Sequence, residues 1–441
     1  MAAVSLAFSR GKRAIWLRYV LVGILSVAGF ANVCRCIVGI FPPRVYDTRD
    51  LAQEYTMARA VLLGENPYQQ LPDLVARFVQ IPPEQLAGWT LYSFSPHPPP
   101  VVVLALPLGL LSYQAASWAW FVFELVCVVG AASLVWGCRF GQPLTPATVT
   151  LAGLLALAWY PAAEGMYWGQ LMTVLLLLLT GAWLALLSGQ DRLGGILLGL
   201  SVALKLLTWP LIVLLVFRRR WQAAGASVLA LAAANVAAGV VMGFDHVVDY
   251  YVHIGPQVFS LYRNHGSSFS TPSLIWRLFE GTGSPLMEGM IAPPLVNAVW
   301  AAQPLSMLVS LSLVGLVLYV TRKSSFEGAF GVLVCVSLSI SPVAWMHYLT
   351  LALIPVVIVG SRLFESRFPK QESGVAYLVG FLLHTHVWVW QIVLRSVEGR
   401  LDHPVVPFAV SLLPLVPTLL PVLGLAWLVW RLEQKGVTVQ W

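Results

Sequence analysis

Few side chains in this sequence can do acid–base chemistry, because only 10% of its 441 residues are charged. Lys205 lies in the middle of an apolar stretch, where a charge costs about 2.5–3.5 kcal/mol to insert into a bilayer. A cation kept at that cost indicates anion binding, and a lipid phosphate is the anion expected there. The alternative is a lysine whose ammonium reaches back to the membrane surface. Glu124, an acid in another apolar stretch, is interpreted as a structural hydrogen-bonding group between helices.

Two aspartates, Asp47 and Asp50, follow the first long apolar stretch. A carboxylate at a membrane surface can act as a general base toward a substrate hydroxyl. Residues 50–64 also have the spacing of an amphipathic helix that ends at Gly64, and we expect this helix to lie flat on the membrane. An aspartate directly before a helix is a common N-terminal cap. From spacing alone, the catalytic and the capping interpretations of Asp50 are both open.

Two further groups of polar residues lie near apolar stretches. His347 follows a proline and a tryptophan in the segment Ser-Pro-Val-Ala-Trp-Met-His-Tyr. Arg263, Asn264 and His265 lie in a polar segment that is rich in tyrosine. This mixture suits sugar and phosphate binding. An ordinary exposed loop can have the same composition, and a lone histidine at a helix end is more often structural.

The elements that position these residues are predicted to be membrane helices. Hydrophobic residues make up 58% of the chain and charged residues only 10%, whereas a soluble domain carries about 25% charged residues. So much apolar surface cannot be hidden from water, so the bilayer must be the solvent. We predict an all-α polytopic membrane protein, a single domain over residues 1–441, with two large polar segments at 42–98 and 244–303. About twelve apolar runs are long enough to be spans: 17–41, 99–112, 115–137, 146–162, 168–188, 193–217, 222–242, 304–321, 328–346, 348–364, 374–394 and 404–430.

Lysine and arginine clusters in the short loops predict the orientation of the chain, because they favour the cytoplasmic side. Counted across the spans, the clusters fall on one side, so both termini should be cytoplasmic and both large segments extracytoplasmic, in a multi-pass plasma-membrane protein. Runs 99–112 and 193–217 are the weak points of this topology, since either can be a re-entrant or kinked element. The clusters are Arg10/Lys12/Arg13, Arg218/Arg219/Arg220, Arg322/Lys323, Arg362/Arg367/Lys370 and Arg431/Lys435.

Several function classes lack their sequence signatures. The chain has no GxxxxGKS loop, HExxH motif or GxSxG elbow, which argues against an ATP-driven pump, a zinc protease and a serine hydrolase. Its five cysteines have no paired spacing and are interpreted as small core residues. Because the basic residues fall in short loops, the net charge of +7 is interpreted as an orientation signal rather than as nucleic-acid binding.

An ordered series of motifs runs from about residue 40 to residue 365. The motifs are Asp50 to Ala60 closing with Gly64-Glu65-Asn66-Pro67-Tyr68, Tyr92-Ser93-Phe94-Ser95-Pro96, Trp168-Gly169-Gln170, Gly195 to Lys205 with Pro210, Arg263-Asn264-His265 with Ser273 and Arg277, and Ser341-Pro342-x-x-Trp345-x-His347. Together they resemble glycosyltransferase family 87, the polyprenol-phosphate-mannose-dependent mannosyltransferases of the GT-C superfamily. One departure is Glu54, where the family often has a second aromatic residue.

The resemblance implies a GT-C-like fold and an inverting transfer of a hexose, above all mannose, from a polyprenyl-phosphate donor to a lipid or glycan acceptor outside the cytoplasm. It makes Asp50 the catalytic base, with Asp47 as fallback, and requires no metal or other cofactor. The residues expected at the donor phosphate and sugar are Lys205, His347, Arg263, Asn264 and His265. Those expected at the acceptor or in structural roles are Tyr55, Tyr68, Tyr92, Trp168, Gln170 and Trp345.

Two other functions fit a membrane protein of this composition. A transporter or flippase of lipid-linked sugars should show paired repeats and polar residues at the midplane, whereas this chain has two large outer segments that carry acids. A polymer ligase or lipid-A-type transferase of related fold is the third possibility. Transfer of labelled mannose to membrane lipids separates the glycosyltransferase from the transporter.

Overall fold

Helices account for almost all of the computed structural model, which describes residues 2–42, 50–80, 94–266, 268–282, 293–365, 372–376, 378–380, 382–383 and 418–434. The helices are α1 (Ala2–Ile40), α2 (Leu51–Leu62), α3 (Leu71–Phe78), α4 (Pro99–Ala105), η3 (Leu106–Leu110), α5 (Tyr113–Leu134), η4 (Val135–Arg139), α6 (Pro146–Leu157), α7 (Tyr160–Trp168), α8 (Met172–Leu187), α9 (Asp191–Leu204), η5 (Leu206–Thr208), α10 (Trp209–Phe217), α11 (Trp221–Met242), α12 (Phe244–Asp249), η6 (Tyr250–Ile254), α13 (Gly255–Tyr262), α14 (Thr271–Glu280), α15 (Val299–Val320), α16 (Phe326–Ile340), η7 (Met346–Ala352), α17 (Leu353–Glu365) and α20 (Leu419–Gln434).

Within the described residues, five helices are long and apolar enough to cross a membrane, and a sixth span results if α6 and α7 are counted together. The outward side chains of these helices are apolar, with Val27 of α1, Leu229 of α11 and Trp300 of α15 exposed by 69%, 71% and 83%. Such surfaces are stable against lipid tails and not against water. The prediction of a helical membrane protein is therefore confirmed, while the count of twelve spans stays a prediction.

Two runs that were predicted to be single helices are broken. Run 146–162 is not one continuous helix, because α6 and α7 meet at 85°, and Pro161 in the first turn of α7 cannot continue the helix before it. Run 193–217 breaks at Lys205, whose backbone is extended. Pro210 lacks the N–H that would bond a carbonyl one turn earlier, so an unbroken helix cannot pass this point.

The broken run 193–217 also returns to the end from which it starts. Arg220 pairs with Asp191 and donates to the carbonyl of Leu186 at 2.7 Å, so the start of α9 and the end of α10 lie together. Run 193–217 is therefore a hairpin and not a single straight helix, which agrees with the re-entrant alternative left open by the sequence. Lys205 lies at the apex of this α9–α10 hairpin, away from the arginine end.

Close packing against α11 fixes helix α9. A Cβ added to Gly195 would lie 2.2 Å from the carbonyl oxygen of Ala223, and one added to Gly199 would lie 2.2 Å from that of Ser227. Glycines four residues apart let two helix backbones approach this closely. The packing therefore sets the height at which α9 presents Lys205.

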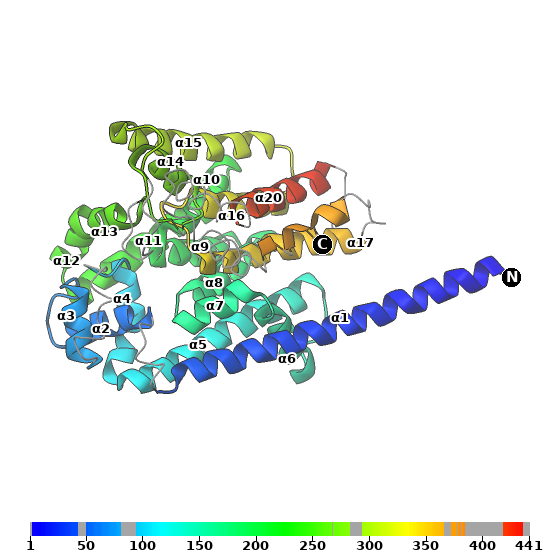
Figure 1. Ribbon diagram of the computed structural model, residues 1–441, viewed down its shortest axis with the longest axis horizontal. Helices are drawn as coiled ribbons and strands as arrows, with labels where there is room; N and C mark the ends of the chain where they lie inside the picture. Colours follow the sequence, from blue (N-terminus) through cyan, green and yellow to red (C-terminus); the bar gives the residue numbers. More distant parts are fainter. Residues whose placement is uncertain are drawn as a thin grey trace.

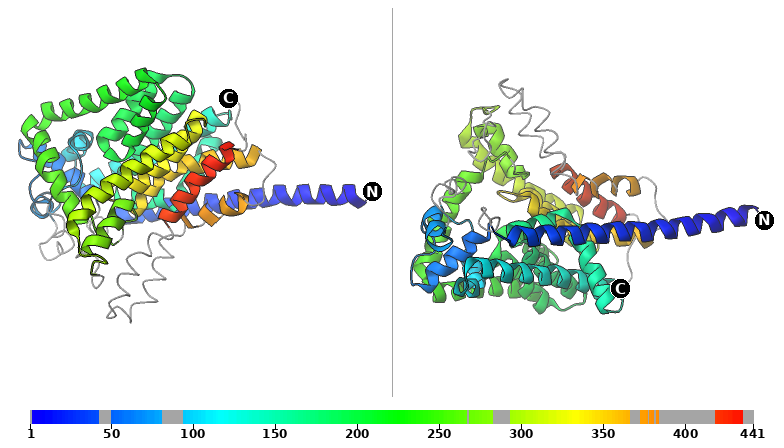
Figure 2. Two further views of the ribbon diagram at one scale, coloured as in Figure 1. Left: turned by 90° about the horizontal axis from the view of Figure 1, so that it is seen from above. Right: turned by 60° about the horizontal axis from the view of Figure 1, so that its bottom comes forward.

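The first large polar segment contains the predicted helix, but protein covers this helix on nearly all sides. Helix α2 ends near Gly64, whose φ of 72° suits a left-handed cap. Nearly all side chains of α2 are buried, including Glu54 and Met57. Figure 1 shows α2, α3 and α4 grouped at one end of the bundle beside α12 and α13, and Figure 2 shows the long helix α1 running alongside the bundle and beyond it. Helix α2 is therefore enclosed by protein.

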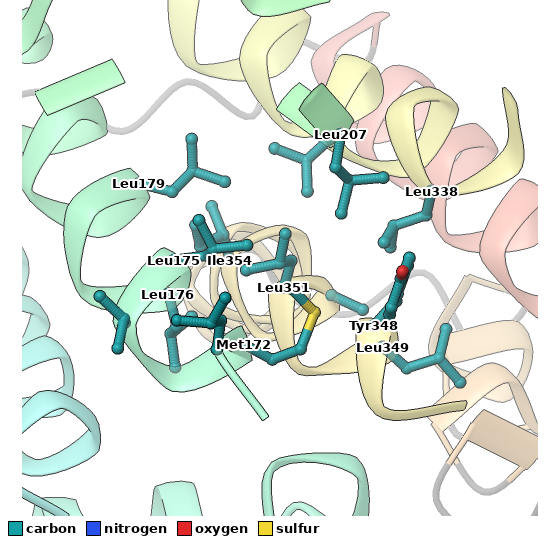
Figure 3. Close-up of a cluster of buried hydrophobic side chains, with 14 of the residues drawn as sticks. Met172, Leu175, Leu176, Leu179, Leu207, Leu338, Tyr348, Leu349, Leu351 and Ile354 are labelled. Atoms are coloured by element: carbon teal, nitrogen blue, oxygen red, sulfur yellow. The ribbon is translucent and has the colours of Figure 1, made fainter. Parts of the chain in front are cut away.

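An apolar core supports the segment that carries His347. Side chains from α8, η5, α16, η7 and α17 meet there, and Figure 3 shows Tyr348 and Leu349 of η7 packed beside Met172. Trp159, at the α6–α7 bend, donates its indole N–H to the carbonyl of Leu349 at 2.9 Å. The bend and the core thus hold η7 in position.

Candidate active site

Asp50 lies directly before α2 but does not cap it, because its side chain accepts no hydrogen bond from the helix backbone. Its carboxylate instead accepts hydrogen bonds from the side-chain amides of Gln170 and, at 3.4 Å, of Gln53. The capping interpretation of Asp50 is therefore not supported. The residue as a whole is half-buried.

Gln170 comes from the break between α7 and α8. Gly169 has a φ of 74°, a left-handed conformation that turns the chain, and its carbonyl accepts the indole N–H of Trp120 at 3.0 Å. This fixed turn aims Gln170 at Asp50. The neighbouring Trp168 has another partner, since it donates to Glu164 at 2.9 Å.

A second acid, Glu54, lies one helical turn after Asp50. It is completely buried, and its Oε1 lies 2.6 Å from Nδ1 of His97, which is also buried. The chain around His97 is held by two tyrosines: Tyr68 donates to the carbonyl of His97 at 3.1 Å, and Tyr250 donates to the carbonyl of Pro96 at 2.8 Å. Tyr68 therefore has a structural contact that positions His97.

Lys205 faces these acids from the apex of the α9–α10 hairpin. Its ammonium interacts electrostatically with Asp50 and Glu54, yet among the described residues no carboxylate oxygen lies within 4.0 Å of it. The Nζ atom lies 4.1 Å from the ring centre of Tyr348, a cation–π contact. A half-buried cation without a close carboxylate is suited to bind an anion.

His347 completes the cluster on the side of η7. Its imidazole interacts electrostatically with Lys205 and His97. The side chain is 9% exposed, and its Nε2 has no hydrogen-bond partner in the described structure. Since a buried polar atom without a partner costs about 1–3 kcal/mol, this nitrogen is a candidate for contact with a substrate.

Burial raises the pKa of Asp50 to about 6. The hydrogen bond from Gln170 lowers this pKa, the charge of Glu54 raises it, and His97 and Lys205 lower it. A carboxylate whose pKa lies near neutrality is a better proton acceptor than an ordinary aspartate and is still ionised at pH 7. The arrangement therefore suits general base catalysis.

The second large polar segment, 244–303, contributes differently from what its composition suggested. Arg263 is paired with Glu280, at 2.9 Å from Nε to Oε2, so its charge is already matched. Asn264 and His265 are buried, and the His265 ring lies 4.7 Å from that of Trp345. Burial lowers the pKa of His265 to about 4, so the imidazole is neutral at pH 7. These residues attach the segment to the chain just before His347.

The remaining predicted residues have structural contacts or lie outside the described chain. Tyr55 donates to the carbonyl of Leu111 at 3.0 Å and packs against Tyr113. Asp47 and Tyr92 lie outside the described residues. No group of three or more His, Cys, Asp or Glu side chains within the described part of the chain is placed to hold a metal ion.

Glu54 and His97 are the site residues that sequence reasoning missed. Glu54 carried a signal, since a residue four positions after Asp50 lies on the same face of a helix. His97 stands between prolines and shows no periodicity, so nothing in the sequence pairs it with Glu54.

Comparison with known proteins places the chain in a family. Glycosyltransferase family 87 matches residues 96–342, more than half of the chain. The matched region includes His97, Gln170 and Lys205, while Asp50 and His347 lie outside it. No match was found among curated proteins or among solved structures. The resemblance drawn from the motifs is confirmed, and the chain belongs to glycosyltransferase family 87.

Proposed function

We propose that this glycosyltransferase moves a hexose, first of all mannose, from a polyprenyl-phosphate sugar to a glycolipid or glycan acceptor. The observation that carries the proposal is that a half-buried acid, Asp50, lies in the same cluster as a cation, Lys205, that has no close carboxylate. A base for the acceptor and a partner for a leaving phosphate are the two groups that this reaction needs.

In the proposed reaction Asp50 removes a proton from an acceptor hydroxyl while that oxygen attacks the anomeric carbon of the donor. The bond from the anomeric carbon to the phosphate oxygen breaks, and polyprenyl phosphate leaves with the electron pair. A single displacement inverts the anomeric configuration. Lys205 and Nε2 of His347 stabilise the negative charge on the leaving phosphate, and Gln170 orients the carboxylate of Asp50.

A polyprenyl-phosphate donor explains why the enzyme is embedded in a membrane. The polyprenyl tail is apolar, so it binds among the spans while its phosphate reaches Lys205. We further propose a single domain with several spans, a plasma-membrane location and an extracytoplasmic site. The grouping of α2, α3, α4, α12 and α13 at one end of the bundle supports a site built by the two outer segments.

Asp50→Asn tests the assigned base, with Asp73→Asn as a matched control, since Asp73 is an exposed acid of the same outer segment. We expect transfer from labelled polyprenyl-phosphate mannose to fall about 10²–10⁴-fold in Asp50→Asn and to stay at the wild-type level in the control. Full activity of Asp50→Asn would show that another group is the base. If the wild type moves lipid-linked sugar across vesicles without transferring it, the transporter hypothesis replaces this one.

A further inference from the structure

Neither Glu54 nor His97, which lie in contact, takes part in a step of the proposed reaction. Both side chains are buried, and no part of Glu54 is exposed. Burying a carboxylate and an imidazole costs free energy unless they are well partnered. A pair kept at that cost within the site calls for an explanation of its own.

The position of Glu54 makes it a competitor for Lys205. Glu54 follows Asp50 by one helical turn, and both carboxylates interact electrostatically with the Lys205 ammonium. Opposite charges attract each other more strongly where protein shields them from water. A carboxylate free to turn toward Lys205 would therefore compete with a phosphate for the same ammonium.

His97 is the contact that holds Glu54. The Oε1 atom of Glu54 lies 2.6 Å from Nδ1 of His97, at ion-pair distance, and neither carboxylate oxygen of Glu54 has a hydrogen-bond partner in the described structure. The backbone at His97 is fixed in turn by the hydroxyls of Tyr68 and Tyr250. The backbone that carries the His97 imidazole is therefore fixed, so the imidazole can restrain the Glu54 carboxylate.

We infer that His97 is a positioning residue that holds the Glu54 carboxylate away from Lys205 and so leaves the Lys205 ammonium free for the donor phosphate. This inference rests on the proposed function, because it needs Lys205 to bind that phosphate. It assigns to His97 an effect on donor binding and not on proton transfer. The ionisable groups that interact electrostatically with Glu54 or His97 are Asp50, Lys205 and His347.

A double-mutant cycle between His97→Ala and Glu54→Gln tests the inference. In His97→Ala, Glu54 is released toward Lys205, so the KM for the polyprenyl-phosphate sugar should rise about tenfold, within the range of measured coupling energies. The kcat at saturating donor should change much less. In the double variant the competing charge is gone, and the donor KM should return to within about threefold of the wild-type value.

One further variant, His97→Gln, and a comparison of Glu54→Gln with Asp50→Asn keep the test decisive. His97→Gln, whose amide can still donate to Glu54, should keep most of the donor affinity. If the double variant has a donor KM as high as that of His97→Ala, His97 is merely structural and the inference fails. If Glu54→Gln abolishes transfer while Asp50→Asn keeps it, the Glu54–His97 pair is itself the base, and the proposed function fails in its mechanism. Thermal stability of every variant in detergent shows whether the protein is folded.

Discussion

Two groups of ionisable residues lie at opposite ends of the same helices. The first, the site cluster, consists of Asp50, Glu54, His97, Lys205 and His347. The second, here called the paired cluster, consists of Arg139, Glu327, Arg362 and Glu433. Helix α5 and its extension η4 begin near α2 and end at Arg139, and η7–α17 runs from His347 to Arg362.

In the paired cluster, every charge has a close partner. Glu327 lies 3.3 Å from both Arg139 and Arg362, and Arg362 lies 2.6 Å from Glu433. Glu433 also accepts the backbone N–H of Ser325 at 2.8 Å. Two arginines and two glutamates balance, so the cluster joins the ends of four helices and leaves no charge for a ligand.

The site cluster differs in what it leaves unmatched. Lys205 has no carboxylate within 4.0 Å among the described residues, Asp50 is only half-buried, and Nε2 of His347 lacks a partner. Buried charge therefore does not by itself indicate function. The distinction lies in whether the charges satisfy one another, and substitutions at the two clusters should consequently have opposite effects on stability and activity.

Removing a charge from the paired cluster should have the largest effect on stability. Arg362→Met leaves Glu433 and Glu327 buried with too little positive charge, which typically costs about 3–5 kcal/mol. We expect a strongly lowered unfolding temperature in detergent. Arg322→Met, which removes an exposed arginine at the same end, should cost less than about 0.5 kcal/mol. Equal stability of the two variants would contradict the structural role of the paired cluster.

Removing the charge of Lys205 should instead reduce activity and preserve the fold. Lys205→Met takes away the cation proposed for the leaving phosphate, and the loss of one such stabilising group lowers transfer about 10²–10³-fold. The unfolding temperature should stay constant or rise, since a half-buried charge without a close carboxylate no longer needs to be desolvated. Lys323→Met, at an exposed position, is the matched control. An unfolded Lys205→Met protein would make this lysine structural, like Arg362.

Disturbing the backbone packing that positions Lys205 should have an intermediate effect on both stability and donor binding. Gly199→Ala places a methyl group 2.2 Å from the carbonyl oxygen of Ser227, so α9 must move away from α11. Overpacking of this kind costs about 1–3 kcal/mol, and the shift should also raise the donor KM. Gly225→Ala, on α11 with no atom within 4 Å of the added carbon, should change neither. Unchanged stability in Gly199→Ala would mean that α9 adjusts without strain.

The sequence predicted the members of the site cluster that stand out by cost or position. Lys205 is conspicuous because a charge inside an apolar run is rare, and Asp50 because it precedes a well-marked helix. The structure brings both together with Gln170 and His347. The roles of these residues in the reaction remain proposals that the variants above test.

What the sequence could not predict depends on contacts between distant segments. Glu54 meets His97 only after α2 and the Pro-rich segment fold together. The amphipathic pattern of α2 indicated a surface helix, since the pattern does not reveal what covers the polar face. Arg263 was expected at a phosphate, but Glu280 neutralises it, and one helix pattern cannot show a partner seventeen residues away. The 85° bend between α6 and α7 lies in a run whose hydropathy is continuous.

The smallest expected effect is a shift in the pH dependence of transfer, which reports on the ionisation of Asp50. Because the pKa of Asp50 is about 6 and the base must be ionised, kcat/KM should fall about tenfold per pH unit below pH 6 and level off above it. The hydrogen bond from Gln170 stabilises the ionised carboxylate and lowers this pKa. Gln170→Leu should therefore move the acidic limb of the profile to higher pH, while Asp73→Asn leaves it in place. A shift to lower pH would show that the titrating group is not the carboxylate that Gln170 contacts.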